Sequence, residues 1–271
     1  AMLLPGVTLV VSPLISLMAD QVQALRENGV EAEYINSTLS ENQYSQTLRK
    51  LRSGRCKLLY IAPERLELAS FQNILADLEV PLVAVDEAHC VSQWGQDFRP
   101  SYLKIAPAVA ALPKRPTLAA FTATATERVR RDIVKLLELR DPQVLVTGFD
   151  RPNLYFEVRT PRDKKRELLS ILRERRDKSG IVYCATRAAV EEVCELLCAE
   201  GFKAVRYHAG LGDNERASAQ EAFQYDDARV MVATNAFGMG IDKSNVGYVI
   251  HYNMPKSLDA YYQEAGRAGR D

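Results

Sequence analysis

Short apolar runs, each followed by a stretch with helical periodicity, constrain the fold of this chain more than any other feature. Residues 7–12, 57–62 and 82–85 are mostly Leu, Ile, Val and Ala, with no regular polar alternation. A strand that is covered on both faces of a parallel sheet has this pattern. Because helix-like stretches separate the runs, the sequence predicts an α/β fold with doubly wound parallel sheets.

The same alternation runs through the whole chain and restarts once. Strands are expected at residues 7–12, 32–36, 57–62, 82–85, 117–122 and 144–147, and again at 154–158, 180–184, 204–208, 230–234 and 248–251. Helices are expected at residues 14–28, 41–52, 63–78, 102–111, 127–139, 164–176, 188–200, 215–225 and 258–263. Residues 1–4 resemble the tail of a helix, so the first sheet is expected to lack a first strand. The breaker-rich segment TGFDRPN predicts a boundary, with domains at 1–150 and 151–271.

Charge and cysteine content exclude several classes of protein. Lys plus Arg and Asp plus Glu number 35 each, so any nucleic-acid site must be a local strip rather than a basic domain. The five cysteines have no CxxC spacing, which favours a reducing compartment and gives no support for a zinc site. Cys194 and Cys198 share a helix face but have no nearby histidine. With no signal peptide or run of membrane length, we expect a soluble, cytoplasmic protein that makes no membrane contact.

Two carboxylates follow the apolar run at residues 82–85 directly. Asp86 and Glu87 are therefore expected at the carboxyl end of a strand, where open α/β sheets bind ligands. A carboxylate there suits Mg²⁺, which takes one or two carboxylates together with phosphate oxygens. Considered alone, the pair is better explained as a helix cap or a solvated turn.

An aromatic-rich loop, CVSQWGQDFRPSY, occupies residues 90–102 and contains the only tryptophan. Two interpretations remain open for Trp94 and Phe98. They can fill the domain core, as aromatic side chains often do, or they can stack on nucleic-acid bases. The glycine and polar residues around them favour a mobile loop that stacks on bases.

These blocks together resemble the RecQ family of superfamily 2 DEAH-box, ATP-dependent DNA helicases. The resemblance rests on DEAH followed by the aromatic-rich loop, and on further blocks in the expected order. Those blocks are SPLISLMADQV, YIAPERL, FTATAT, GIVYCATR, VATNAFGMGIDK and YYQEAGRAGRD. Together these blocks span nearly the whole chain, from Ser12 to Asp271.

The chain also departs from the family pattern. None of its 14 glycines is followed by lysine, so the phosphate-binding loop that ends in Gly-Lys-Ser/Thr does not occur in this sequence. The glutamine-containing adenine motif, the zinc-binding region and the winged-helix region of the family are missing as well. We expect a segment of a longer helicase, truncated on both sides.

The resemblance implies two RecA-like parallel-sheet domains with a nucleotide cleft between them, the first incomplete at its N-terminus. It implies ATP and Mg²⁺ as cofactors, and ATP hydrolysis coupled to 3′–5′ movement on single-stranded DNA and duplex unwinding in recombination and repair. Single-stranded and branched DNA are the expected partners. The fragment by itself is expected to be inactive.

The resemblance also implies site residues. Asp86 is expected to hold Mg²⁺ and Glu87 to orient or deprotonate the attacking water. By the same resemblance, Arg267 and Arg270 are the expected arginine fingers. Being three apart, they are expected on one face of a helix or of its terminal turn, and a guanidinium group stays charged and offers forked donors to phosphate oxygens. Residues expected to bind ATP or to couple it to DNA are His89, Thr122, Thr124, Gly240, Asp242 and Gln263. Residues expected to contact DNA are Ser12, Pro13, Trp94, Phe98, Arg99, Thr186, Arg187 and Thr234.

Two other functions were weighed against this one. The first is a DNA-binding or regulatory module without ATPase activity, which takes the missing phosphate-binding loop at face value. The second is an RNA-directed DEAH helicase, which the aromatic-rich loop disfavours.

Overall fold

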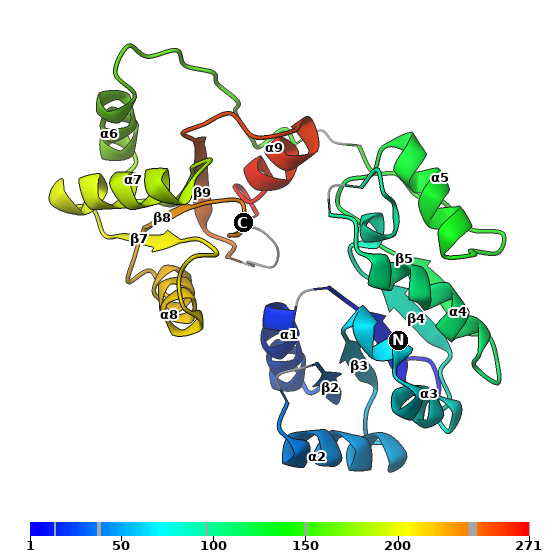
Figure 1. Cartoon of the computed structure of the whole chain (residues 1–271). Coiled ribbons are helices and arrows are strands. Elements are labelled where there is room, and N and C mark those ends of the chain that lie inside the picture. Colours follow the sequence, from blue (N-terminus) through cyan, green and yellow to red (C-terminus); the bar gives the residue numbers. More distant parts are fainter. Residues whose placement is uncertain (14, 37–38, 96, 149–150, 238–242, 271) are drawn as a thin grey trace. The chain divides into compact units, whose positions relative to one another are not determined.

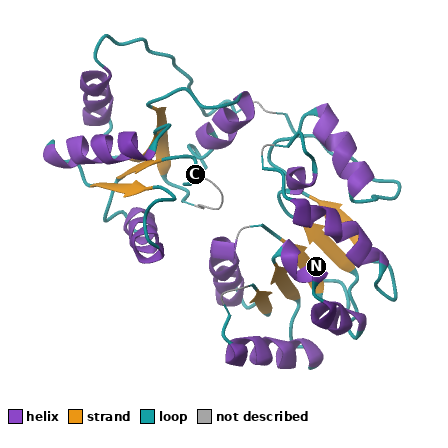
Figure 2. Cartoon of the chain, in the orientation of Figure 1, coloured by secondary structure: helices purple, strands orange, loops and turns teal. Residues whose placement is uncertain are grey.

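The computed structural model describes the chain except for residues 14, 37–38, 96, 149–150, 238–242 and 271, together with the side chains of residues 16 and 17. The chain divides into two compact units, Ala1–Leu145 and Val146–Asp271. Each unit has its own parallel sheet, whose strands are accompanied by helices (Figures 1 and 2).

The first unit has a sheet of five described strands in the order β2-β3-β1-β4-β5. The strands are β1 (Thr8–Val11), β2 (Ala32–Ile35), β3 (Leu58–Ile61), β4 (Leu82–Val85) and β5 (Thr117–Ala120). Its helices are α1 (Ile15–Glu27), α2 (Glu41–Arg52), α3 (Ala69–Ala76), α4 (Ile105–Ala110) and α5 (Glu127–Leu136), with short 3₁₀ turns at Pro63–Glu67, Ala88–Val91 and Pro100–Lys104. The strand order changes direction between β1 and β4, so the ends of these two strands form a topological switch point.

Apolar strands and capped helices explain this fold locally. Leu9 and Val11 of β1 and Val83 and Val85 of β4 are buried in one hydrophobic core. β1 pairs with both β3 and β4 in register, so the most apolar strands lie in the middle of the sheet. Helix α2 begins with a capping box, in which the Ser40 hydroxyl accepts a hydrogen bond from the backbone N–H of Gln43.

The second unit has four described strands in the order β7-β8-β6-β9, all parallel. These are β6 (Ser179–Tyr183), β7 (Ala204–Tyr207), β8 (Val230–Ala233) and β9 (Val246–His251). The helices are α6 (Lys164–Glu174), α7 (Arg187–Ala199), α8 (Asp213–Gln224) and α9 (Leu258–Ala265). Every residue of β6 and β8 is buried, as the continuous apolar runs in the sequence predict. The α/β class and the two parallel sheets are thus confirmed.

Three expected elements do not form. Residues 144–147 and 154–158, predicted as strands, have no strand structure, and Leu145 and Val158 are 89% and 85% exposed. A strand needs a neighbour for its backbone N–H and C=O groups, and these segments pair with none of the described strands. Residues 1–4, predicted as the tail of a helix, form a turn in which the Leu4 N–H bonds to the Ala1 carbonyl. Within the described residues, no helix has both the length and the apolar character needed to cross a membrane.

A cluster of polar side chains anchors the amino end of β6 in the second unit. Asp226 accepts hydrogen bonds from the Ser179 hydroxyl at 2.6 Å, the Lys243 ammonium at 2.9 Å and the Asn245 amide at 3.0 Å. These hydrogen bonds, that from Ser179 foremost, lower the pKa of Asp226 from 3.8 to about 2. The Lys243 side chain is only 2% exposed, so it depends on this carboxylate for its charge partner.

We expect Asp226→Asn to lower the melting temperature at pH 7. A carboxyl whose pKa is depressed by folding stabilises the fold above its unfolded pKa, and this contribution disappears as pH falls through the folded pKa. The difference between wild type and variant should therefore narrow between about pH 4 and pH 2. Thermal unfolding, followed by circular dichroism across this pH range, measures the difference in melting temperature between wild type and variant. A difference that stays constant down to pH 2 would contradict the assigned role.

Candidate functional site in the first unit

The acidic pair lies at the switch point of the first sheet. Asp86 follows β4 and Ser12 follows β1, and the Ser12 hydroxyl donates a hydrogen bond to Asp86 Oδ2 at 3.2 Å. The backbone N–H of Glu87 donates to Asp86 Oδ1 at 2.9 Å. Each carboxylate oxygen has a second lone pair, and Asp86 is only half-buried. The carboxylate is therefore both oriented and accessible to a ligand.

Glu87 has an unusual backbone conformation. Its φ of 46° and ψ of 45° lie in the left-handed region, which costs a residue with a side chain roughly 1–2 kcal/mol. The conformation turns the chain directly from β4 into the 3₁₀ turn Ala88–Val91. Strain of this kind persists where the surrounding structure enforces it, and it is concentrated at functional sites.

His89 connects the acidic pair to the end of β5. Its Nδ1 lies 2.9 Å from Thr122 Oγ1 and 3.3 Å from Glu87 Oε2. The Thr122 hydroxyl donates its own proton to the Thr124 carbonyl at 3.0 Å, so it can only accept from His89. This network assigns the proton of the His89 ring to Nδ1. Two predicted coupling residues, Thr122 and Thr124, are thereby joined to Glu87 through one imidazole.

Tyr102 holds the backbone of the acidic pair in place, a role that the sequence did not predict. Its hydroxyl donates a hydrogen bond to the Asp86 carbonyl at 2.9 Å, and the residue is fully buried. Burial raises the pKa of Tyr102, and the negative charge of Asp86 raises it further, so the phenol stays protonated and remains a donor. Burial likewise raises the pKa of Cys90 to about 12, which keeps this thiol neutral.

The aromatic-rich loop is fixed close to the acidic pair. The Ser92 hydroxyl donates to Asp132 of α5 at 2.6 Å and accepts from the Trp94 N–H at 3.1 Å. A side chain at Gly95 would place its Cβ 2.2 Å from the His89 carbonyl oxygen. Only glycine allows the loop to pass so close to the residue that contacts Glu87.

Trp94 lies on the surface of this loop. The side chain is 61% exposed, so the interpretation that it fills the domain core is wrong. The Arg128 guanidinium lies 3.5 Å from the centroid of the Trp94 ring, in a stacked cation–π arrangement. Arg128 stands in the first turn of α5, and no motif in the sequence marks it as a partner of the loop.

The other residues of this unit that are predicted to contact DNA differ in their burial and in the hydrogen bonds that they already make. Arg99 donates to Asp97 through Nε and Nη2, both at 2.9 Å, and to the Pro13 carbonyl through Nη1 at 3.1 Å. Phe98 is half-buried, whereas Ser12 and Pro13 are buried. Because the Ser12 hydroxyl is occupied by Asp86, its position gives no support to a DNA-phosphate contact; it orients the acidic pair instead.

Predicted site residues of the second unit

The two predicted arginine fingers differ in exposure. Arg267 is 5% exposed and Arg270 is exposed. Both lie near Tyr183, where burial raises the pKa of the phenol to about 12 and the two guanidinium groups act in the opposite direction. The Arg267 Nε is buried without a hydrogen-bond partner among the described residues. A buried donor without a partner is costly, so this atom is available for an acceptor that is not part of the structure.

Thr186, Arg187 and Thr234 gather at the carboxyl edge of the second sheet. Thr186 follows β6 and caps α7 by accepting from the Ala189 N–H at 3.2 Å, while Thr234 follows β8 and is buried. The Arg187 side chain is exposed and lies against Gly210, where a Cβ would come within 3.1 Å of Nη1. Gln263 is half-buried in α9. The predictions for Gly240 and Asp242 lie outside the described residues.

Two histidines of this unit have structural partners. His208 Nε2 lies 2.7 Å from Glu191, and His251 Nε2 lies 2.9 Å from Glu264. Their interpretation as satisfied structural residues is confirmed. The hydrogen bond from His208 and the nearby Arg206 lower the pKa of Glu191.

Among the described residues, Asp86 is a candidate ligand for a metal ion. No group of three or more His, Cys, Asp or Glu side chains in the described part of the chain is arranged to hold a metal ion. Asp86 fits the hydrated Mg²⁺ of a nucleotide complex, which needs only one or two protein carboxylates because phosphates and water supply the remaining ligands. Its two oriented oxygens and partial exposure meet that requirement.

Comparison with known proteins agrees with this geometry. Two family models match the chain: DEAD/DEAH box helicase over residues 3–133, and helicase conserved C-terminal domain over residues 163–271. The chain is 50% identical over 271 residues to the ATP-dependent DNA helicase RecQ of Bacillus subtilis, covering all of this chain and 46% of that protein. It is 46% identical over its full length to the RecQ helicase of Pasteurella multocida, of which it covers 43%.

More distant relatives and solved structures extend the likeness. The chain is 41% identical to the ATP-dependent helicase SGS1 of Saccharomyces cerevisiae over 98% of this chain and 19% of that protein. The fold resembles S. cerevisiae Dbp5 bound to RNA and ADP BeF3, with a TM-score of 0.71, 20% identity, and coverage of 98% of this chain and 68% of that one. It also resembles the Mycobacterium smegmatis helicase Lhr bound to ssDNA and AMP-PNP, with a TM-score of 0.69, 20% identity, and coverage of 98% and 38%. The chain spans less than half the length of the RecQ proteins it matches.

Proposed function

Because this chain belongs to the RecQ family of DEAD/DEAH box helicases, we propose that it is the motor segment of an ATP-dependent DNA helicase. Its role is to couple ATP hydrolysis to 3′–5′ movement along single-stranded DNA and to unwinding of duplex and branched DNA in recombination and repair. The proposed location is the cytoplasm. The proposed cofactors are ATP and Mg²⁺.

One observation supports this proposal most strongly. An oriented Asp86, a strained Glu87 and the His89–Thr122 link occupy the switch point of a parallel sheet, which is where open α/β sheets bind ligands. Phosphoryl transfer needs little covalent chemistry from the protein, only positioning and charge stabilisation. Asp86 is positioned by Ser12 and Glu87 is contacted by His89, so this pair of carboxylates provides the positioning.

Each residue has a proposed part. Asp86 holds the Mg²⁺ that neutralises charge on the transferred phosphoryl group, and Glu87 orients the attacking water and accepts its proton. Arg267 and Arg270 donate to γ-phosphate oxygens of ATP, a role for which the unsatisfied Nε of Arg267 is suited. His89, Thr122 and Thr124 transmit the state of Glu87 toward DNA, and Gln263, Gly240 and Asp242 contribute to nucleotide binding. Trp94, Phe98 and Arg99, with Pro13, Thr186, Arg187 and Thr234, contact the DNA strand.

The experiment that tests this function is ATP hydrolysis by the full-length gene product, with and without a single-stranded oligonucleotide. DNA-stimulated hydrolysis is expected. A product that binds the oligonucleotide but does not hydrolyse ATP would instead be the DNA-binding module without ATPase activity.

The 271-residue chain alone is expected to turn over ATP very slowly. It contains no glycine followed by lysine, so it lacks the lysine that reaches the β- and γ-phosphates and the adjoining hydroxyl that binds Mg²⁺. Release of ADP, measured with and without oligo(dT), checks this expectation. DNA-stimulated turnover at about 1 s⁻¹ or faster, the lower end for ordinary enzymes, would contradict it.

A further inference from the structure

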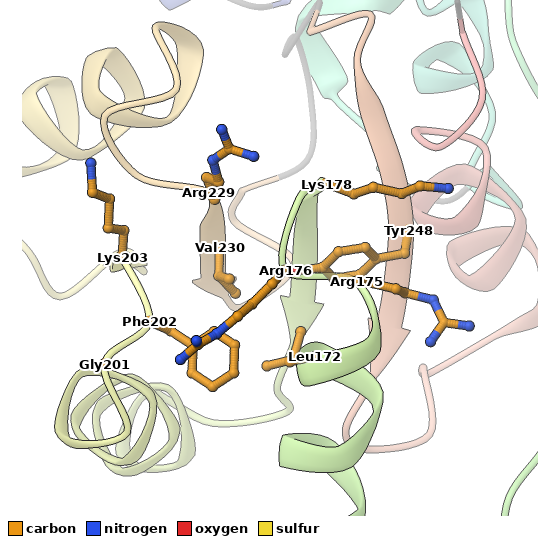
Figure 3. Close-up of a pocket in the computed structure, with 10 residues that line it drawn as sticks. All are labelled: Leu172, Arg175, Arg176, Lys178, Gly201, Phe202, Lys203, Arg229, Val230 and Tyr248. Atoms are coloured by element: carbon orange, nitrogen blue, oxygen red, sulfur yellow. The ribbon is translucent and has the colours of Figure 1, made fainter.

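A basic pocket opens at the amino edge of the second sheet, the edge opposite to Thr186 and Thr234. The pocket has a volume of about 200 Å³, and the described residues that line it include five cationic side chains and no acidic one. The five are Arg175, Arg176, Lys178, Lys203 and Arg229. Figure 3 shows Arg176 beside the ring of Phe202, and Arg175 and Lys178 beside the ring of Tyr248, whereas Lys203 and Arg229 extend away from both rings.

Three of these cations form a row that follows the strand order. Lys203, Arg229 and Lys178 immediately precede β7, β8 and β6, which are neighbours in the sheet. Parallel strands lie about 4.8 Å apart, so the row extends over about 10 Å. A nucleic-acid strand carries one charge per about 3.4 Å of axis. The row therefore matches a linear series of about three phosphates better than a single compact anion.

The position of these cations is not explained by helix ends. Basic residues favour the last turn of a helix because of its dipole, but the effect is confined to that turn. Helices α6, α7 and α8 end at Glu174, Ala199 and Gln224, four or five residues before the cations of the row. The first unit provides an internal comparison, because its five strands are preceded by Val7, Glu31, Lys57, Pro81 and Pro116. One basic residue in five positions forms no row.

Two glycines shape the pocket wall. A Cβ at Gly180 would lie 2.1 Å from the Tyr248 ring, and a Cβ at Gly247 would lie 2.9 Å from the Lys178 side chain. The ring of Tyr248 and the stem of Lys178 thus lie directly on bare backbone. The wall and one cation of the row are held by close packing, which a loosely solvated surface does not need.

The cations of the row keep most of their charge available. The Lys178 and Lys203 ammonium groups have no hydrogen-bond or ion-pair partner in the part of the chain that the structure describes. Arg229 donates through Nη1 to the Asp177 carbonyl, which orients the guanidinium without neutralising it. Arg176 lies 5.2 Å from the Phe202 ring, and within the described part of the chain it has no ion pair with a carboxylate. An unneutralised row is an attractive site for a polyanion.

We propose that the amino edge of the second sheet, centred on Lys178, Lys203 and Arg229, is a second nucleic-acid site that binds the sugar-phosphate backbone of a strand. It goes beyond the proposed helicase activity, because the strand contacted there is separate from the one at the carboxyl edge. Contacts to phosphates hold a strand without reading its sequence. Such a site retains DNA while the motor acts on another stretch of it.

The test is binding of fluorescein-labelled oligo(dT) to the 271-residue chain without nucleotide, measured by anisotropy over a range of salt concentrations. The triple variant Lys178→Gln, Lys203→Gln, Arg229→Gln should bind about tenfold or more weakly at low salt. Each single-strand phosphate contact contributes about 0.7 to the slope of log K against log salt, so the slope should fall by about 2.

A matched control variant removes three positive charges from the first unit instead of from the pocket. Lys104→Gln, Lys114→Gln, Lys135→Gln changes three exposed lysines scattered over the first unit and should leave affinity and slope nearly unchanged. Circular dichroism establishes that both triple variants are folded. Equal losses in the two triples, or no loss in the pocket triple, would overturn the proposal. So would a pocket triple that loses affinity for labelled polyglutamate but keeps its affinity for oligo(dT).

The outcome is separable from the helicase proposal. The carboxyl-edge variant Arg187→Gln and ATP hydrolysis by the full-length product report on the motor, whereas the pocket triple reports on the amino edge. Normal DNA-stimulated hydrolysis together with unchanged oligo(dT) binding by the pocket triple would reject the second site alone.

Discussion

Glu87→Gln should lower single-strand-stimulated ATP hydrolysis by the full-length gene product by about 10²–10⁴-fold, the range that a positioned general base contributes. The amide keeps the size and hydrogen-bonding capacity of the side chain but accepts a proton very poorly. Glutamine is also expected to retain the left-handed backbone at this position, because the backbone N–H that bonds to Asp86 remains. The loss should appear in kcat rather than in the affinity for DNA.

A neighbouring glutamate provides the control for this experiment. Glu127 in the first turn of α5 is 75% exposed in its side chain and pairs loosely with Arg131 at 3.9 Å. Glu127→Gln removes the same charge from the same unit and should leave hydrolysis within about twofold, because exposed pairs of this kind contribute little. Binding of a labelled oligonucleotide should be unchanged in both variants. Hydrolysis by Glu87→Gln at the wild-type rate would remove Glu87 from the chemistry.

The positions of Asp86 and Glu87 were predictable because they depend on local sequence. A run of four apolar residues ends where the acids begin, and a parallel sheet places the ends of such runs along one edge. The support of the pair was not predictable. Tyr102 and Ser12 reach Asp86 from 16 and 74 residues away, and no local pattern encodes a contact across that separation.

The failed strand predictions have a related cause. Residues 144–147 and 154–158 have the β-branched and aromatic composition of strands, but β-propensity mainly expresses how a side chain packs on a neighbouring strand. In this structure these segments have no neighbour among the described strands, and Tyr155 is 86% exposed. Composition therefore predicted where strands can form rather than where they do.

The aromatic-rich loop shows how tertiary contacts decide between two readings of one sequence. Aromatic residues alone allowed Trp94 either in the core or on the surface. The hydrogen bond from Ser92 to Asp132 and the close passage of Gly95 past His89 hold the loop so that the indole stays outside. The indole is thus exposed on a loop whose backbone passes close to the His89 carbonyl, which suits the proposed link between DNA and ATP hydrolysis.

Trp94→Ala should weaken binding of oligo(dT) by about 5- to 150-fold, because stacking of a base on an aromatic side chain contributes about 1–3 kcal/mol. Trp94→Phe should recover part of this loss, since a smaller ring still stacks. Tyr155→Ala removes another highly exposed aromatic side chain and should have little effect. In the full-length product, Trp94→Ala should also reduce the stimulation of ATP hydrolysis by single-stranded DNA.

The contact between Arg128 and Trp94 allows a second test of base stacking on the indole. Trp94 is the only tryptophan beside 12 tyrosines, so fluorescence that is excited at a wavelength which tyrosine does not absorb reports the environment of this ring alone. Arg128→Ala should change the emission of the free chain, because the guanidinium 3.5 Å from the ring centroid is lost, and oligo(dT) should quench the emission of wild type. A double-mutant cycle of Trp94→Ala and Arg128→Ala then separates stacking from charge. If the loop binds bases through the stacked pair, the two losses will not add; additive losses would mean that Arg128 contacts DNA independently of the indole.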